Sequence, residues 1–152
     1  MIDIFNKRSE IFSLLEKLNV TAKPVFGKMS PQHMIEHIAI VVSVSNGKHP
    51  QKLYSTPEKA EVLKANLIYS NIEMPVGVKA PMLSDEPSPL FFPDMENAIS
   101  SLRKELIRFD EFFEGNLQAT PMHPVLGPLT HKEWIIFHNK HFTHHFKQFK
   151  LI

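Results

Sequence analysis

The chain of 152 residues contains no cysteine. This absence excludes a disulfide framework, a cysteine nucleophile and a zinc site with thiolate ligands, which leaves histidine and carboxylate side chains as the strong metal ligands. Glycine is scarce, with 5 residues, and the chain has no glycine-rich phosphate loop, G-x-S-x-G elbow or dinucleotide fingerprint. Nucleotide-binding and serine-hydrolase folds of the common kinds are therefore not expected.

The chain also lacks an excess of charge and a long apolar run. Its 17 basic and 16 acidic residues give a formal net charge of +1, so no basic surplus is available for phosphates and no nucleic-acid partner is expected. The most apolar stretch, residues 38–44, is far too short to span a bilayer, and charges from residue 3 onward argue against a signal peptide. We expect no membrane contact and, by default, a cytoplasmic protein.

Hydrophobic residues make up 43% of the chain, including 12 phenylalanines, which predicts one domain over residues 1–152 with a packed core. Apolar residues at helical spacing and capping signals predict long helices over residues 3–19, 31–46, 94–114 and 130–148, and a short helix over 57–68. This pattern predicts an all-α fold, a four-helix bundle with a long connection between its second and third helices that contains the short extra helix.

Two proline-rich segments separate these helices. Residues 71–93 hold five of the twelve prolines together with Gly77, and residues 116–129 form a second such loop. The first segment also contains many apolar residues, so we expect it to be ordered, to cross one end of the bundle and to act as a lid over a pocket.

The last helix carries an unusual cluster of histidines. Four of the nine histidines, at positions 138, 141, 144 and 145, lie within eight residues. A stripe with steps of four and three residues is formed by Trp134, His138, His141, His145 and Gln148. Within it, His141 and His145 are one turn apart and can direct ring nitrogens at one metal ion. The alternative is that each is an ordinary hydrogen-bonded core or surface histidine.

The second helix supplies a candidate third ligand. His37 lies on its apolar face between Met34 and Val41, and it can meet the histidine pair of the last helix if the two helices face each other. On spacing alone it is equally a core histidine. His33 and His123 are lower-ranked candidates, and for Glu36 a solvated role is favoured over one that supports a ligand.

Two stretches resemble a known family. SPQHMIEHIA at 30–39 and HPVLGPLTHKEWIIFHNKHFTHHFKQF at 123–149 are similar to the DinB-like superfamily, also called the YfiT-type metal-binding four-helix bundles, and most similar to a subgroup ending in HPxxG, LTxxEW and HxxHHxxQF motifs. The resemblance implies a divalent ion held by one histidine of the second helix and a His-x-x-x-His pair of the fourth, here His37, His141 and His145. It also implies, for some members, transfer of a low-molecular-weight thiol onto an electrophile.

These observations lead to three hypotheses about function. The leading one is a metal-dependent thiol S-transferase with a small-molecule substrate and a divalent Zn, Ni, Fe or Co ion. In it His138 acts as a proton carrier, and the alternative for His138 is an ordinary packing or hydrogen-bonding role. Side chains expected near the ion or its pocket are Gln148, Trp134, His33 and His123. The alternatives are a metal-dependent hydrolase that uses a metal-bound water, and a non-catalytic metal or small-molecule binding protein. A homodimer is an open alternative, because faces of helix bundles also form dimer interfaces.

Overall fold

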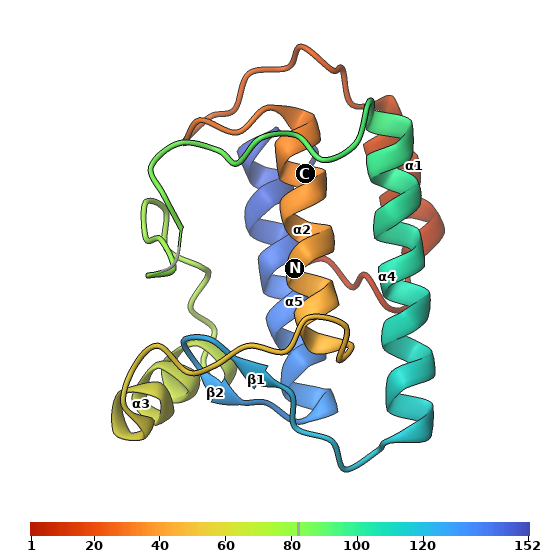
Figure 1. Ribbon diagram of the computed structural model, residues 1–152. Coiled ribbons are helices and arrows are strands. Elements are labelled where there is room, and N and C mark those ends of the chain that lie inside the picture. Colours follow the sequence, from red (N-terminus) through yellow and green to blue (C-terminus); the bar gives the residue numbers. More distant parts are fainter. Residues whose placement is uncertain (82) are drawn as a thin grey trace.

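The computed structural model describes residues 1–81 and 83–152, and this part of the chain is mostly helical (Figure 1). Its elements, in chain order, are α1 (Arg8–Lys17), α2 (Pro31–Ser45), α3 (Pro57–Ile68), α4 (Met95–Gly115), β1 (Met122–His123), β2 (Gly127–Pro128) and α5 (His131–Gln148). Each helix falls within or close to a segment that the sequence predicts as helical. The largest difference is at the N-terminus, where α1 begins at Arg8 rather than at residue 3.

Polar side chains define where four of these helices start, as the sequence predicts. In each case the side chain of the residue before the helix accepts a hydrogen bond from a backbone N–H of the first turn, which otherwise has no partner. The donor and acceptor residues are His33 to Ser30, Lys59 to Thr56, Asn97 to Asp94, and Glu133 to Thr130. Local sequence is sufficient to place these helix ends.

The loop over residues 116–129 differs from the prediction because it contains a small antiparallel hairpin. Met122 pairs with Pro128, and His123 pairs with Gly127. The turn is closed by the ring of His123, whose Nδ1 accepts the backbone N–H groups of Val125 and Leu126 at 3.1 and 3.0 Å. Strands of two residues have no hydrophobic period, so sequence patterning cannot reveal them.

The helices α2 and α5 lie side by side, and α2 also packs against α4, while α1 lies against α4 (Figure 1). Six apolar residues that recur at helical spacing on α4 are all buried and form its core-facing seam: Met95, Ile99, Leu102, Leu106, Phe109 and Phe113. The short α3 lies at one end of the molecule, in contact with the hairpin and α5. None of the described helices is long and apolar enough to cross a membrane.

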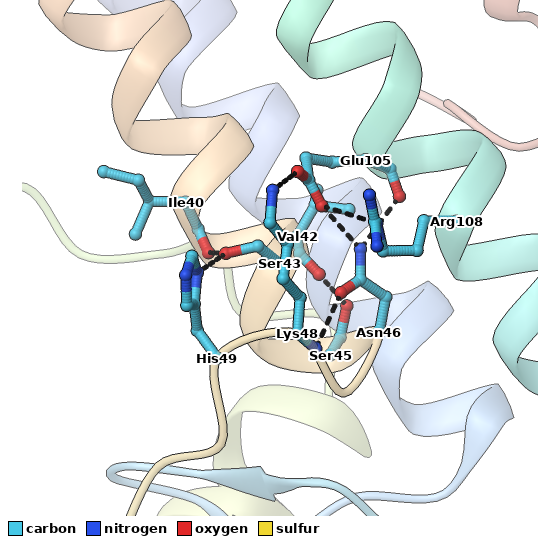
Figure 2. A network of polar contacts seen from close by, with 9 residues as sticks. All are labelled: Ile40, Val42, Ser43, Ser45, Asn46, Lys48, His49, Glu105 and Arg108. Carbon is cyan, nitrogen blue, oxygen red and sulfur yellow. Dashed lines mark hydrogen bonds and ion pairs between the residues drawn. The ribbon is translucent and has the colours of Figure 1, made fainter. Parts of the chain in front are cut away.

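A polar network joins the C-terminal end of α2 to α4 (Figure 2). Asn46 donates to the Glu105 carboxylate at 2.8 Å and to its backbone carbonyl at 3.1 Å, and Lys48 forms an ion pair with the same carboxylate. Burial raises the pKa of Glu105, but the hydrogen bonds from Lys48 and Asn46 outweigh this effect and the net pKa is lowered. The network fixes the end of α2 relative to α4.

The proline-rich connection runs from α3 along α5 and crosses α2 before it enters α4 (Figure 1). It is attached to α2 by Glu36, whose carboxylate accepts the backbone N–H groups of Phe91 and Phe92 at 2.7 and 3.0 Å. Glu36 is only 6% exposed, so the solvated role favoured by the sequence is wrong. A carboxylate that is buried without a cation needs N–H donors of this kind. Met82, one of the apolar residues of this connection, lies outside the described residues.

Candidate metal centre

Three histidines from two helices meet between α2 and α5. The Nε2 atom of His141 lies 3.0 Å from Nε2 of His37 and 3.1 Å from Nε2 of His145. One ring nitrogen from each histidine lies within 4.8 Å of the other two. His141 and His145 are each 6% exposed, and His37 is partly buried. The three candidate ligands that the sequence singles out are therefore close together in space.

Helical spacing and packing produce this meeting point. His141 and His145 are one turn apart on the face of α5 that is turned toward α2, so their rings project in the same direction. His37 lies on the opposing face of α2, flanked along the helix by the fully buried Met34 and Ile38. The apolar contacts that pack the two helices therefore also bring His37 against the pair.

Burial keeps these imidazoles neutral. It lowers the pKa of His37 to about 4 and of His145 to about 3, with smaller contributions from neighbouring histidines, and it holds the pKa of His141 well below the ordinary 6.5. A neutral imidazole carries a lone pair on one ring nitrogen, which is the form that binds metal ions. At neutral pH the three side chains are in that form.

Gln148 determines which nitrogen of His145 is free. The Gln148 amide donates from Nε2 to the backbone carbonyl of Phe26 at 2.9 Å, and its Oε1 lies 2.8 Å from Nδ1 of His145. Because a carbonyl only accepts, the amide must place Nε2 toward Phe26 and Oε1 toward His145. The His145 proton is then on Nδ1, and its Nε2 lone pair points toward His141.

The loop that carries Phe26 is a part of the site that sequence reasoning missed. Gly27 adopts φ +74°, and a Cβ at this position would lie 3.1 Å from the Gln148 amide nitrogen. The backbone N–H of Val25 also donates to the backbone carbonyl of Gln148 at 2.8 Å. The signal available in the sequence was Gly27 itself, because glycine is the residue that most readily adopts the left-handed region.

The donor set fits a divalent cation. His145 presents the lone pair of its Nε2 atom to His141. If Nε2 of His141 carries a proton, it can form a good hydrogen bond with only one of its two neighbours, His37 or His145. A cation at this point would accept lone pairs from all three rings, and nitrogen ligands of a tetrahedral zinc ion lie roughly 3.3 Å apart, close to the observed separations. His141 departs from the usual pattern, because its buried Nδ1 has no hydrogen-bond partner among the described residues.

His138 lies on the predicted stripe but not at the centre. Its side chain is 0% exposed, and its ring stacks on Trp134 with centroids 5.3 Å apart. The Ser45 hydroxyl donates to the Val42 carbonyl at 2.7 Å, so Nε2 of His138 must donate to Ser45, at 2.8 Å. Burial lowers the pKa of His138 to about 3. A ring enclosed in this way is suited to core packing, and its setting does not support a role in carrying protons to a substrate.

The other side chains expected near the site also have local structural partners. Trp134 is 0% exposed and donates from its indole nitrogen to the Pro121 carbonyl at 3.2 Å. His33 completes the cap of α2, with its Nδ1 lying 2.7 Å from the Ser30 hydroxyl. His123 closes the hairpin turn and packs on Phe137, and burial lowers its pKa to about 3. None of the three belongs to the converging nitrogens.

Comparison with known proteins places the chain in a family but not in a functional class. A family model described as "Protein of unknown function (DUF1569)" matches residues 4–151. No curated protein and no solved structure matches the chain. The description of the family names no activity, so function has to be argued from the site itself.

Proposed function

The chain belongs to the DUF1569 family, and we propose that it is a metal-dependent enzyme whose centre is formed by His37, His141 and His145. The observation that carries this proposal is the convergence of three neutral imidazole nitrogens at separations suited to one ion. Three neutral ligands suit Zn, Ni, Fe or Co, and they leave at least one coordination position for a small molecule.

We further propose that the fold is a DinB-like four-helix bundle. Support comes from the helices α1, α2, α4 and α5 and from the long connection between α2 and α4 that contains α3. The C-terminal sequence motif, with its histidine pair and Gln148, supports the same assignment.

The reaction that best fits this centre is transfer of a low-molecular-weight thiol onto an electrophile. A divalent ion bound here would lower the pKa of the thiol and favour the thiolate, the nucleophilic form. The chain contributes ligands that carry no negative charge, so the full charge of the ion is available to stabilise an anion. The rings of α5 that surround the ligands, such as Phe137 stacked on His141, reduce access of water.

Hydrolysis is less well supported by the same geometry. Among the described residues, the group of converging ligand atoms contains histidines and no carboxylate. Metal-dependent hydrolases commonly use a nearby carboxylate as the general base, and His138 is enclosed in the core. A group of ligands that includes no carboxylate favours a reaction in which the nucleophile only has to lose its own proton.

The first test is the metal content of untagged protein. We expect about one ion per chain in the wild type and a loss of the ion in His37→Ala, His141→Ala and His145→Ala, with unchanged helical circular dichroism. His49→Ala is the control, because His49 is exposed and contacts Ser43 rather than the centre. A wild type that is metal-free and does not bind added Zn, Ni or Co would refute the site.

The second test addresses the reaction. Metal-loaded protein would be mixed with an aromatic chloride electrophile and a panel of low-molecular-weight thiols, and loss of free thiol would be followed. We expect consumption that depends on both the thiol and the metal and that is absent in His141→Ala. A fully loaded protein that accelerates ester hydrolysis without any thiol would support the hydrolase instead, and inactivity on both panels would support a non-catalytic binding protein.

A further inference from the structure

The side of α5 next to the one that bears the histidine centre is joined to the connection that follows α3. The side chain of Lys140 is buried, and its ammonium group donates to three backbone carbonyls, those of Leu67, Ser70 and Ile72, at 2.6, 2.8 and 2.7 Å. All three N–H groups of the lysine are used in this way. The backbone at the end of α3 is therefore held in one position against α5.

Two further side chains on the same face of α5 continue this attachment. His144 lies one turn after Lys140, and its Nδ1 is 3.3 Å from the Met74 carbonyl. Lys147 forms an ion pair with Glu73 at 2.5 Å. Residues 67–74 are thus fixed to α5 at successive points, and the surface between them is preformed rather than assembled when a ligand arrives.

A cavity of about 410 Å³ lies between α5 and this segment. Its walls are mainly apolar and are supplied by Phe26, Ile72, Met74, Val76 and Ile136. Ile72 and Val76 are each 60% exposed, so the cavity is open at their side. The volume falls in the range of small-molecule sites, and none of the three histidines of the centre lines it, so it is a separate site.

Among the ionisable groups that α5 presents to this cavity, only His144 offers a hydrogen-bond acceptor, because the other two are lysines. The ammonium of Lys140 is saturated by carbonyls, and Lys147 is neutralised by Glu73. The Met74 carbonyl can only accept, so His144 donates from Nδ1 and carries a lone pair on Nε2. No partner for this Nε2 atom is found within the described part of the chain.

We propose that this cavity binds a small uncharged molecule that has an apolar body and one hydrogen-bond donor, which Nε2 of His144 accepts. The apolar walls favour a flat or compact hydrocarbon body by burying its surface. A donor is selected because a ligand that covers Nε2 of His144 without donating to it would leave this acceptor unpaired. A charged ligand is not favoured, because the charge of Lys147 is already balanced by Glu73. The cavity is a neighbour of the metal centre, because the ring of His144 packs edge-on against that of His145 with centroids 5.0 Å apart, but the proposal requires neither a bound metal nor the reaction proposed above.

The test uses metal-free full-length protein and three related probes: indole, which has one N–H donor, 1-methylindole, which has none, and indole-2-carboxylate, which adds a negative charge. Binding would be followed by nuclear magnetic resonance through the methyl groups of Ile72, Val76 and Ile136. We expect saturable shifts with indole and binding of 1-methylindole that is about 3- to 10-fold weaker, the loss of one ordinary hydrogen bond. The carboxylate should bind no more tightly than indole.

Two variants locate the site. Ile72→Trp fills the cavity and should abolish the indole shifts, whereas Val62→Trp is its control, because Val62 is 61% exposed on α3 and does not line the cavity. In His144→Phe the ratio between indole and 1-methylindole should fall to about 1. Absence of saturable shifts, equal binding by Ile72→Trp, an unchanged ratio in His144→Phe, or tighter binding of the carboxylate would each overturn the proposal.

Discussion

Gln148 offers the sharpest way to test how the metal centre is organised. Its amide accepts the Nδ1 proton of His145 at 2.8 Å and donates to the Phe26 carbonyl at 2.9 Å, so it links a candidate ligand to the loop before α2. Gln148→Leu keeps the approximate size of the side chain and removes both hydrogen bonds. We expect this variant to bind metal more weakly and to be less stable without metal.

The size of both effects follows from what the substitution leaves behind. The substitution removes a partner of the His145 ring and a partner of the Phe26 carbonyl, and a buried polar group without a partner costs about 1–3 kcal/mol. The metal-free variant should therefore lose roughly 2–4 kcal/mol of unfolding free energy. Loss of the group that orients a metal-bound histidine typically weakens metal affinity about 10- to 100-fold, or about 1.4–2.7 kcal/mol.

Gln148→Glu separates the two roles of the amide. A carboxylate still accepts the His145 proton but cannot donate to the Phe26 carbonyl. This variant should lose stability and yet bind zinc within about 3-fold of the wild type, because the orientation of His145 is preserved. Zinc affinity would be measured by competition with a chromophoric chelator, and stability by urea unfolding of the metal-free protein.

Gln32→Leu is the matched control. Gln32 also donates from its amide to a loop carbonyl, that of Phe92, at 2.7 Å, but it contacts no candidate ligand. It should lower stability and leave zinc affinity unchanged. The reasoning would be refuted if Gln148→Leu bound zinc as tightly as the wild type, or if Gln32→Leu weakened zinc binding as much as Gln148→Leu does.

Three further substitutions test other parts of the structure. Gly27→Ala should cost about 1–2 kcal/mol in urea unfolding, because alanine is disfavoured at φ +74° and its Cβ would crowd Gln148; full stability would contradict the close approach. Lys140→Met should cost about 3 kcal/mol in the same assay, since three carbonyls lose a charged donor, and a loss below 1 kcal/mol would show that water replaces it. The pKa of Glu105 is lowered, so its ionised form stabilises the protein above about pH 4.5, and this stabilisation is lost as the pH falls through the lowered pKa. The wild type should therefore be more stable than Glu105→Gln by about 2 kcal/mol at neutral pH, and this difference should shrink in acid. A difference that does not depend on pH would contradict the ion pair with Lys48.

The sequence predicted helices well where the signal is local. The start of α3 is set by Thr56 and Pro57, which lie next to each other, and α3 spans the predicted residues 57–68. A cap and a proline act on backbone groups within one turn, so their effect is largely independent of the rest of the fold. The start of α1 was less accurate, because the spacing of Ile4 and Ile11 does not show where the first turn forms.

His138 shows why a stripe on one helix is not sufficient to define a site. It shares a face with His141 and His145, and by spacing alone it is equally suited to approach a ligand. The structure places it opposite Ser45 and against the ring of Phe109, with centroids 5.6 Å apart, deeper in the core than the other two. Which histidine meets His37 depends on how α2 packs along α5, and this is a property of the pair of helices.

The sequence by itself determined the helices, their caps, the buried seam of α4 and the four-residue spacing of His141 and His145, because each depends on residues within a few turns of one another. Only the tertiary structure decided that His37 completes the group, that Gln148 holds His145 through a loop more than a hundred residues earlier in the chain, and that Lys140 and His144 form one side of a cavity. These features depend on distances between segments that are remote in sequence, and those distances are set by the packing of the whole core.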